Sequence, residues 1–423
     1  MAPWSELPED LLALVFARIF FPVDRARFQA VCRSWRFAAR PPTRQLPWIV
    51  LPNGGFMTPS NRALHRIVSY PKAVMSCIGM APADRSMHHL VSFPETVTCI
   101  GSTDDWIAIA DAADNMHRYY LHNMFSGTTL SLPSLDAAIG GHVSQLFEIR
   151  KVLLRSTPDD VIALMTNHRS CPIILTRLGK GVWLPKSYAA ALVSIVDVAF
   201  LGDRLYGITQ DEDLVFLDIA YDSGVPTVTS GKCVIGQGFD CCDDDDDDDD
   251  DGQVNNEEGN DSCDEDSYDL TKMTEEDMIP EAIRYMDVDE STHHDIITMC
   301  YLIVSRGKLL MVRRQVLSPF KFTHSVEVFE ANMSEAMWVP VKGGLNDQSL
   351  FISRPFSKSV SASISISGEI EKDVIYFADR DDIFYMRSEI VRPQRTGFDW
   401  YNICLRGPKP AQLTWVFPPE LVA

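Results

Sequence analysis

The 423-residue sequence contains no apolar stretch long enough to cross a membrane. Its most apolar runs, LLALVFARIFF and YAAALVSIV, are shorter than the roughly 20 residues that a membrane-spanning helix needs. Its first residues, MAPWSELPED, lack the basic segment of a secretory signal peptide. The ten cysteines include no C-x-x-C pair, so we expect neither disulfides nor a zinc site. These absences predict a protein of the cytoplasm or the nucleus that does not contact a membrane.

Local signatures of catalysis are also missing. The sequence contains no H-E-x-x-H, G-x-x-x-x-G-K-[ST], G-x-S-x-G or G-x-G-x-x-G motif. We therefore predict no catalytic residue, no metal and no cofactor. An active site assembled from distant residues leaves no local trace, so an enzyme remains an open alternative.

The net charge of −21 is concentrated in one segment. Residues 240–290 contain 24 acidic and two basic side chains, including nine consecutive aspartates from Asp243 to Asp251. The remaining 35 acidic and 36 basic residues give a net charge of +1, so charge predicts no nucleic-acid partner. Because like charges repel, we expect 240–295 to be a disordered, low-complexity insert. Arg313 and Arg314 follow an apolar run and are expected to face solvent at a strand end or blade rim.

Residues 1–45 predict a small helical module. Pro8 suits the first position of a helix, and Glu9 and Asp10 suit the positive end of its dipole. We expect Pro22 to end this helix and Asp24 to cap a second one. Between Pro8 and Pro22, apolar residues recur at helical spacing. They are Leu11, Leu12, Val15, Phe16, Ile19 and Phe20, and Leu14 widens the stripe.

The module continues through AVCRSWR at 30–36 and a third short helix or turn around Trp35. No second cysteine or histidine lies at ligand spacing from Cys32, and the charge of the module is only modestly positive, so neither a metal nor nucleic acid is expected there. A unit of about 40 residues rarely buries enough surface to be stable alone. We therefore expect part of its apolar surface to pack on another protein.

Residues 46–239 and 296–423 predict many short antiparallel strands. Stretches such as VDVAFLGDRLYGITQDEDLVFLDI and CYLIVSRGKLLMVRRQV alternate apolar runs with turn residues. Meanders that recur every 40–50 residues or so favour a β-propeller, here of about six to eight blades. A pair of β-sandwiches or an irregular barrel are the alternatives.

The N-terminal module resembles an F-box. The Leu7-Pro8 turn, the first helix and the block Val31-Cys32-Arg33-Ser34-Trp35 have the order and spacing of that family over about residues 4–40. The resemblance implies a three-helix module that binds the Skp adaptor of cullin–RING ubiquitin ligases. The contact residues that it implies here are Leu7, Pro8, Leu11, Leu12, Val15, Ile19, Val31, Cys32 and Trp35.

The remainder resembles plant F-box proteins of the KIB-like type, whose downstream region is a β-propeller. The matching pieces include CIGSTDDWIAIAD, VAFLGDRLYGIT, YLIVSRGKLLMVRR and VIYFADRDD. The resemblance implies a non-catalytic substrate adaptor whose propeller binds a target protein. Two alternatives stay open: a propeller enzyme with its active site in the central channel, and a scaffold outside any ligase, in which Leu11, Val15 and Trp35 pack on the propeller of the same chain.

Overall fold

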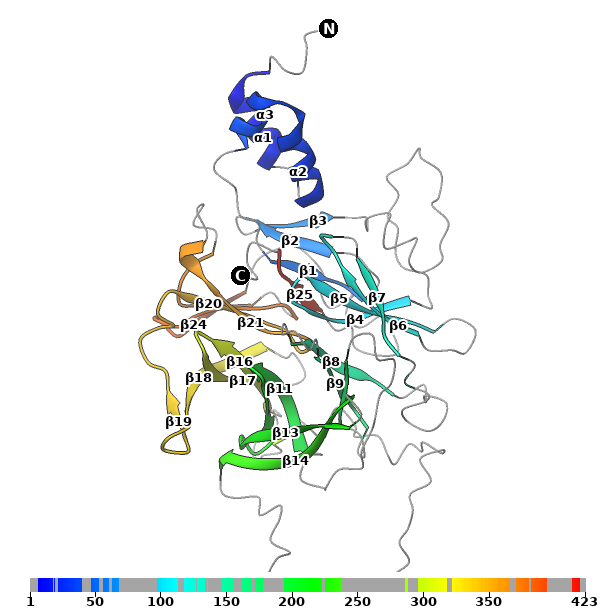
Figure 1. Cartoon of the computed structure of the whole chain (residues 1–423). Helices are drawn as coiled ribbons and strands as arrows, with labels where there is room; N and C mark the ends of the chain where they lie inside the picture. The colour runs from blue at the N-terminus through cyan, green and yellow to red at the C-terminus, as the bar shows by residue number, and fades with distance from the viewer. Residues whose placement is uncertain are drawn as a thin grey trace, which may run out of the picture.

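The computed structural model combines three short helices with an all-β domain (Figure 1). The described residues are 7–17, 19, 22–39, 47–52, 56–60, 63–67, 97–112, 118–126, 128–133, 135, 147–155, 161–168, 172–177, 194–222, 225–236, 286–287, 296–317, 322–364, 370–379, 382–393 and 413–418. The predicted disordered insert, 240–295, lies outside them except for the two-residue strand β15 (Met286–Asp287).

The helices are α1 (Glu9–Ala17), α2 (Pro22–Val31) and α3 (Arg33–Ala38), and they lie at one end of the molecule, outside the sheets (Figure 1). Acidic Glu9 and Asp10 occupy the first turn of α1, as expected from the helix dipole. One expectation was wrong. Asp24 lies inside α2 and does not cap it, because Pro22 itself is the first helical residue, a position that needs no N–H donor.

The strands form six sheets that follow one another along the chain. Pairing is antiparallel throughout the first five, as expected for meanders joined by short turns. The first sheet holds β1 (Trp48–Val50), β2 (Phe56–Ser60), β3 (Ala63–Ile67) and β25 (Thr414–Val416); the second holds β4 (Val97–Thr103), β5 (Trp106–Asp111), β6 (Arg118–Asn123) and β7 (Thr129–Ser131); the third holds β8 (Ile149–Leu154), β9 (Val161–Thr166) and β10 (Ile173–Arg177).

The last three sheets contain the longest strands and one irregular pairing. In the sixth sheet β20 pairs antiparallel with β21 on one side and parallel with β22 on the other. The fourth sheet holds β11 (Ile195–Leu201), β12 (Arg204–Thr209), β13 (Leu214–Asp222) and β14 (Val225–Ile235); the fifth holds β15, β16 (Ile296–Ser305), β17 (Lys308–Leu317), β18 (Phe322–Asn332) and β19 (Met337–Pro340); the sixth holds β20 (Gln348–Ile352), β21 (Lys358–Ser361), a 3₁₀ turn (Ala362–Ile364), β22 (Val374–Phe377), β23 (Asp382–Tyr385) and β24 (Ile390–Pro393).

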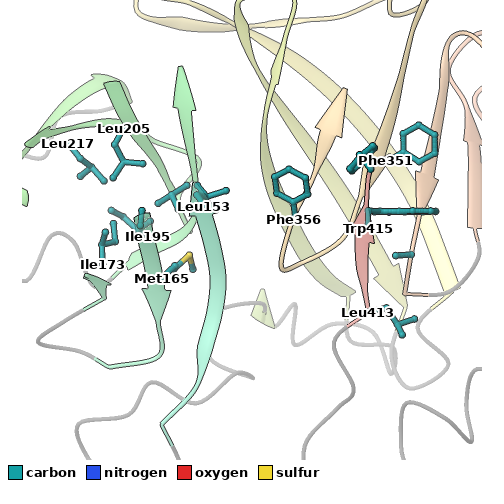
Figure 2. Packing of buried hydrophobic residues seen from close by; sticks show 14 of the residues in the cluster. Leu153, Met165, Ile173, Ile195, Leu205, Leu217, Phe351, Phe356, Leu413 and Trp415 are labelled. Atoms are coloured by element: carbon teal, nitrogen blue, oxygen red, sulfur yellow. The ribbon is translucent and has the colours of Figure 1, made fainter. Parts of the chain in front are cut away.

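Each sheet packs against the next through a shared apolar cluster. One cluster joins the first and second sheets, another the second and third, another the fourth and fifth, and another the fifth and sixth. The largest cluster supplies the two remaining contacts. It joins the third sheet to the fourth around Met165 and Ile195, and the sixth to the first around Phe351 and Trp415 (Figure 2). The sheets therefore close into a ring, and the predicted β-propeller is confirmed, with six sheets as its blades.

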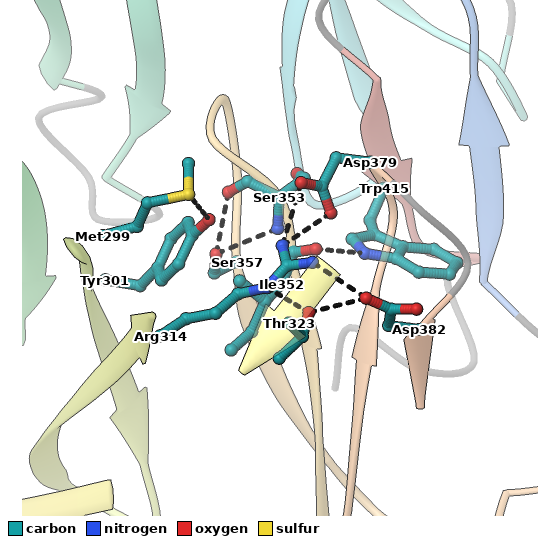
Figure 3. A network of polar contacts seen from close by, with 10 residues as sticks. All are labelled: Met299, Tyr301, Arg314, Thr323, Ile352, Ser353, Ser357, Asp379, Asp382 and Trp415. Atoms are coloured by element: carbon teal, nitrogen blue, oxygen red, sulfur yellow. Dashed lines mark hydrogen bonds and ion pairs between the residues drawn. The ribbon is translucent and has the colours of Figure 1, made fainter. Parts of the chain in front are cut away.

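Ring closure depends on β25, which adds the end of the described chain to the sheet that contains its first strand. Trp48, Ile49 and Val50 pair with Val416, Trp415 and Thr414 respectively. The indole N–H of Trp415 donates to the backbone oxygen of Ile352 at 3.0 Å, which ties the first sheet to the sixth (Figure 3). The pairs between β1 and β25 link segments more than 360 residues apart in sequence, so the ring cannot close until nearly the whole domain is present.

Arg313 and Arg314 are both on β17 but face opposite environments. Arg313 is partly exposed and pairs with Glu212 and Glu327. Arg314 is fully buried and its guanidinium binds Asp379 and Asp382 of the neighbouring sheet (Figure 3). The expectation that both face solvent is wrong for Arg314, because successive side chains of a strand point to opposite faces.

Candidate functional site

The helical module has an apolar core of its own. Leu12 and Phe16 of α1 are buried against Phe28 of α2, and the rings of Phe16 and Phe28 lie 5.2 Å apart. Trp35 of α3 lies on the same cluster, 4.4 Å from Phe28. The guanidinium of Arg25 lies 4.6 Å above the Phe16 ring, a cation–π contact. The three helices therefore fix one another without using the outer face of α1.

The outer face of α1 is apolar and lies in solvent. Leu11 is 48% exposed, Leu14 53% and Val15 45%, whereas Leu12 is 1% exposed. Leu12 and Phe16, one helical turn apart, therefore point into the core of the module. Leu11 and Val15, also one turn apart, point outward. A helix that is apolar on both faces normally has protein on both. This outer stripe is thus a candidate docking surface.

Exposed apolar side chains are concentrated on this module. Ten large hydrophobic side chains are exposed among the described residues, and half of them belong to the three helices. Isolated exposed apolar residues are ordinary, but a group of them on a small module indicates an interaction surface. The five are Leu11, Leu14, Val15, Val31 and Phe37.

The residues that begin the helices occupy defined positions. The backbone oxygen of Pro8 accepts from the N–H groups of Leu11 and Leu12, both at 3.1 Å, so the Leu7-Pro8 turn starts α1. Pro8 is exposed, and Leu7 is half-buried against the core. Cys32 is half-buried between α2 and α3, and its backbone oxygen accepts from Arg36 at 3.0 Å.

The structure thus divides the nine residues expected to contact an adaptor. Pro8, Leu11, Val15 and Val31 are exposed; Leu7, Ile19, Cys32 and Trp35 are half-buried; Leu12 is in the core. The nine residues do not include Leu14 and Phe37, which are both exposed. Leu14 follows Leu11 by three residues, which is the helical spacing that could have added it to the contact residues.

A second candidate site is a cavity among four sheets of the propeller. Its lining includes Arg150 and Lys151 of β8, Asp197 of β11, Tyr301 of β16, and Arg354 just after β20. Side chains from four separate blades meet only near the axis of a propeller, so this cavity belongs to the central channel.

Three ionisable groups of this cavity, Lys151, Asp197 and Cys300, are ion-paired or protonated. Lys151 and Asp197 form a buried ion pair at 2.5 Å. Asp197 also accepts from the backbone N–H groups of Val198 and Leu302, both at 2.8 Å. Burial raises the pKa of the Cys300 thiol to about 12, so at neutral pH it carries its proton and is not a nucleophile. Among the described residues, no group of three or more His, Cys, Asp or Glu side chains could hold a metal ion.

Arg354, which lines the same cavity, is influenced by charges of both signs. Burial lowers the pKa of the Arg354 guanidinium, Asp379 raises it, and the positive charge of Arg150 lowers it again. Two guanidinium groups thus lie close enough to repel each other.

We also find no helix in the described part of the chain that is long and apolar enough to span a membrane.

Comparison with known families agrees with both parts of the structure. The family described as KIB1-4 beta-propeller matches residues 79–395, and the family described as F-box-like matches residues 4–43. Probable F-box protein At4g22060 of Arabidopsis thaliana is 23% identical over 253 residues, covering 52% of this chain and 57% of that protein. F-box protein At1g10110 of the same plant is 28% identical over 249 residues, covering 51% and 56%.

Shorter matches add detail at higher identity. F-box protein SKIP23 of Arabidopsis thaliana is 42% identical over 72 residues, which cover 16% of this chain and 17% of that protein. The chain thus matches little more than half the length of its curated relatives at most. Among solved structures, the N-terminal domain of Nup159 aligns with a TM-score of 0.29 at 9% identity, over 79% of this chain and 70% of that one, too weak to support an argument.

The propeller family matches most of the chain and the helical module matches a second family at the expected position. The matched relatives are plant F-box proteins. The chain therefore belongs to the KIB1-4 beta-propeller family and begins with an F-box-like module.

Proposed function

We propose that this protein is the substrate-recognition adaptor of an SCF-type cullin–RING ubiquitin ligase. The helical module binds a Skp-type adaptor and, through it, a cullin, while the propeller binds a target protein in the cytoplasm or the nucleus. The observation that carries the proposal is the outer stripe of α1, defined as Leu11, Leu14 and Val15, which remains in solvent although the module has a complete core.

The adaptor works by proximity. Holding a target lysine near the activated ubiquitin of another subunit raises its effective concentration, so no residue of this chain takes part in bond formation. The apolar side chains of the stripe supply most of the docking energy, since a few well-packed residues dominate most interfaces. The half-buried Trp35 and Cys32 hold α3 in place at the edge of this contact.

Two observations support this function over its alternatives. A scaffold whose helices pack on its own propeller requires Leu11 and Val15 to be buried within the monomer, and both are exposed. An enzyme with its site in the channel requires an available base or nucleophile, and Lys151, Asp197 and Cys300 are held in ion-paired or protonated forms. The F-box-like match points the same way.

The test is co-purification with a Skp-type adaptor after Leu11→Ser and Val15→Ser are combined. We expect recovery to fall by about thirtyfold or more, which corresponds to a loss of about 2 kcal/mol for a hot-spot pair. The matched control is Met333→Ser with Met337→Ser, which removes two exposed apolar side chains from the β18–β19 turn and β19. Equal recovery of both double variants and the unmodified chain would overturn the proposal.

A further inference from the structure

Outside the helical module, exposed apolar side chains gather on one hairpin of the fifth sheet. Five large hydrophobic side chains of the described propeller residues are exposed, and three of them belong to the β18–β19 hairpin. Met333, in its turn, is 40% exposed, and Met337 and Val339, on β19, are 47% and 39% exposed. These three residues form the hairpin patch. Methionine adapts its shape to many partners and is common at binding surfaces, so the hairpin patch is a further candidate docking surface.

The hairpin is held in place at its turn and along β19. The side-chain oxygen of Asn332 accepts from the backbone N–H groups two and three residues later, at 3.2 and 3.3 Å. The indole N–H of Trp338 donates to the backbone oxygen of Glu212 at 2.7 Å, which fixes β19 on the fourth sheet. Because side chains alternate along a strand, the other face of β19 carries Met337 and Val339. The hairpin patch is therefore ordered before a partner binds, which lowers the entropy cost of binding.

β19 is the outer edge of the fifth sheet in the described part of the chain. It has only four residues, and the last of them, Pro340, has no backbone N–H to donate. Short edge strands with proline are poor templates for an added strand. Side-chain contacts with the hairpin patch, not a new backbone ladder, must therefore hold a partner.

Acidic residues surround the hairpin patch. Residues 322–340 contain three glutamates and neither lysine nor arginine. The β12–β13 turn, which is bonded to Trp338, adds three more acidic residues, and two basic residues of β17 pair with members of this group. The acidic residues are Glu327, Glu330, Glu335, Asp211, Glu212 and Asp213, and the paired basic residues are Lys308 and Arg313.

The charges of this region do not cancel. Six acidic and two basic residues give a net charge of −4, and Arg306 and Lys342, in the segments next to these strands, reduce it to −2. Arg314 of β17 does not offset it further, because it is buried and bound by two aspartates of the sixth sheet. The negative potential around the hairpin patch therefore attracts a basic partner and repels an acidic one.

The same potential disfavours three other occupants. In a symmetric dimer, a second copy would bring its own acidic residues against these. The segment 240–290 of this chain has 24 acidic and two basic residues, a net charge of −22, so it is repelled. An anionic membrane surface is negative as well. A basic partner protein fits the surface better than any of these.

We propose that the hairpin patch binds an apolar segment of the target protein that is flanked by lysine or arginine. The apolar side chains of this segment cover Met333, Met337 and Val339, and its flanking cations face the surrounding carboxylates, which sets the orientation of the segment. That the partner is a target for ubiquitination rests on the proposed function, whereas the binding surface itself does not depend on it.

The probe is a random peptide library displayed on phage and selected against the full-length chain carrying Leu11→Ser and Val15→Ser. This background removes two side chains of the outer stripe of α1, so peptides that bind the stripe are not recovered. Enriched peptides are synthesised, and their dissociation constants are measured by fluorescence anisotropy. We expect them to combine apolar residues with lysine or arginine. Met337→Ser should weaken binding at least fivefold, whereas Ile390→Ser, which removes a similarly exposed side chain from β24, should leave it unchanged.

A charge variant and a second binding assay separate this surface from the adaptor contact. Glu335→Lys should weaken binding of the basic peptides about threefold or more, and the loss should shrink at high salt. Met333→Ser with Met337→Ser should lose the peptides and still bind a Skp-type adaptor. Failure of the proposed function alone would appear as peptide binding without adaptor binding by the unmodified chain. The proposal is overturned if no peptide is enriched, if the enriched peptides lack basic residues, or if Met337→Ser leaves their affinity unchanged.

Discussion

Arg314 forms a buried ion-pair network between two blades of the propeller. Its guanidinium donates to both carboxylate oxygens of Asp379 at 2.8 Å and to Asp382 at 3.2 Å. Thr323 donates to the same oxygen of Asp382 at 2.6 Å and accepts from Arg314 at 2.9 Å (Figure 3). The guanidinium also lies 4.1 Å above the ring of Phe377. The network holds β17 of the fifth sheet to the sixth.

Replacing Arg314 with methionine keeps most of the side-chain volume and removes the charge. The Arg314 side chain is 0% exposed and that of Asp382 is 12% exposed, so the variant leaves a carboxylate without its cation in a nearly dry site. Breaking one partner of a buried pair typically costs 3–5 kcal/mol. Because Asp379 is 44% exposed and water can solvate it, we expect about 3 kcal/mol, the lower end of that range.

The assay is urea unfolding of the full-length protein, followed by tryptophan fluorescence. Arg313→Met is the control, since its neighbours Glu212 and Glu327 are 27% and 51% exposed and such partly solvated pairs contribute about 1 kcal/mol or less. Combining Arg314→Met with Asp382→Asn should restore part of the lost stability, because the unpaired charge is removed as well. If Arg314→Met costs no more than Arg313→Met, the network does not stabilise the contact between the blades.

Three further predictions concern other parts of the chain. Burial lowers the pKa of His122 to about 4 from about 6.5 in the unfolded chain, so the free energy of unfolding should fall by roughly 3 kcal/mol as the pH drops from 6.5 to 4. The His122→Gln variant should lose less stability over this pH range. An equal loss in the variant and the unmodified chain would refute this prediction. Trp415→Ala should lower the free energy of unfolding, measured with urea, by about 3–5 kcal/mol because it removes a buried ring from the strand that closes the propeller. Trp338→Ala should cause a smaller loss, because the Trp338 side chain is only half-buried. Equal losses in the two variants would contradict this prediction. Deleting residues 243–265 should leave the melting temperature within about 1 °C, and a large drop would mean that the acidic tract contributes to folding.

The sequence predicted the hairpins of the propeller because turn residues mark them. Arg306-Gly307 joins β16 to β17, and both residues have positive φ, 52° and 73°, as a two-residue hairpin turn of the primed type requires. Gly202-Asp203 joins β11 to β12 with a positive φ of 60° at its glycine, as the type II′ hairpin turn requires at its first position. The pairing of β25 with β1 could not be predicted, since strand partners so far apart leave no local pattern.

The candidate sites were predictable to different degrees. Helical spacing indicated an apolar α1, but it could not separate the outward Leu11 from the inward Leu12, because that choice depends on where α2 and α3 pack. The burial of Arg314 was missed because strand alternation does not say which face meets a neighbouring blade. The channel cavity was invisible for a similar reason: Arg150 and Arg354 are about 200 residues apart and meet only when the ring closes.

The most direct test of the central claim compares Leu11→Ala with Leu12→Ala, the same change at neighbouring positions on opposite faces of α1. Binding of a purified Skp-type adaptor and the melting of the module are measured for both variants. Leu11→Ala should weaken binding about fivefold or more, a loss of about 1 kcal/mol or more, and change stability by less than about 0.5 kcal/mol. Leu12→Ala should destabilise the module by about 2–5 kcal/mol. Unchanged adaptor binding by a folded Leu11→Ala variant would contradict the account.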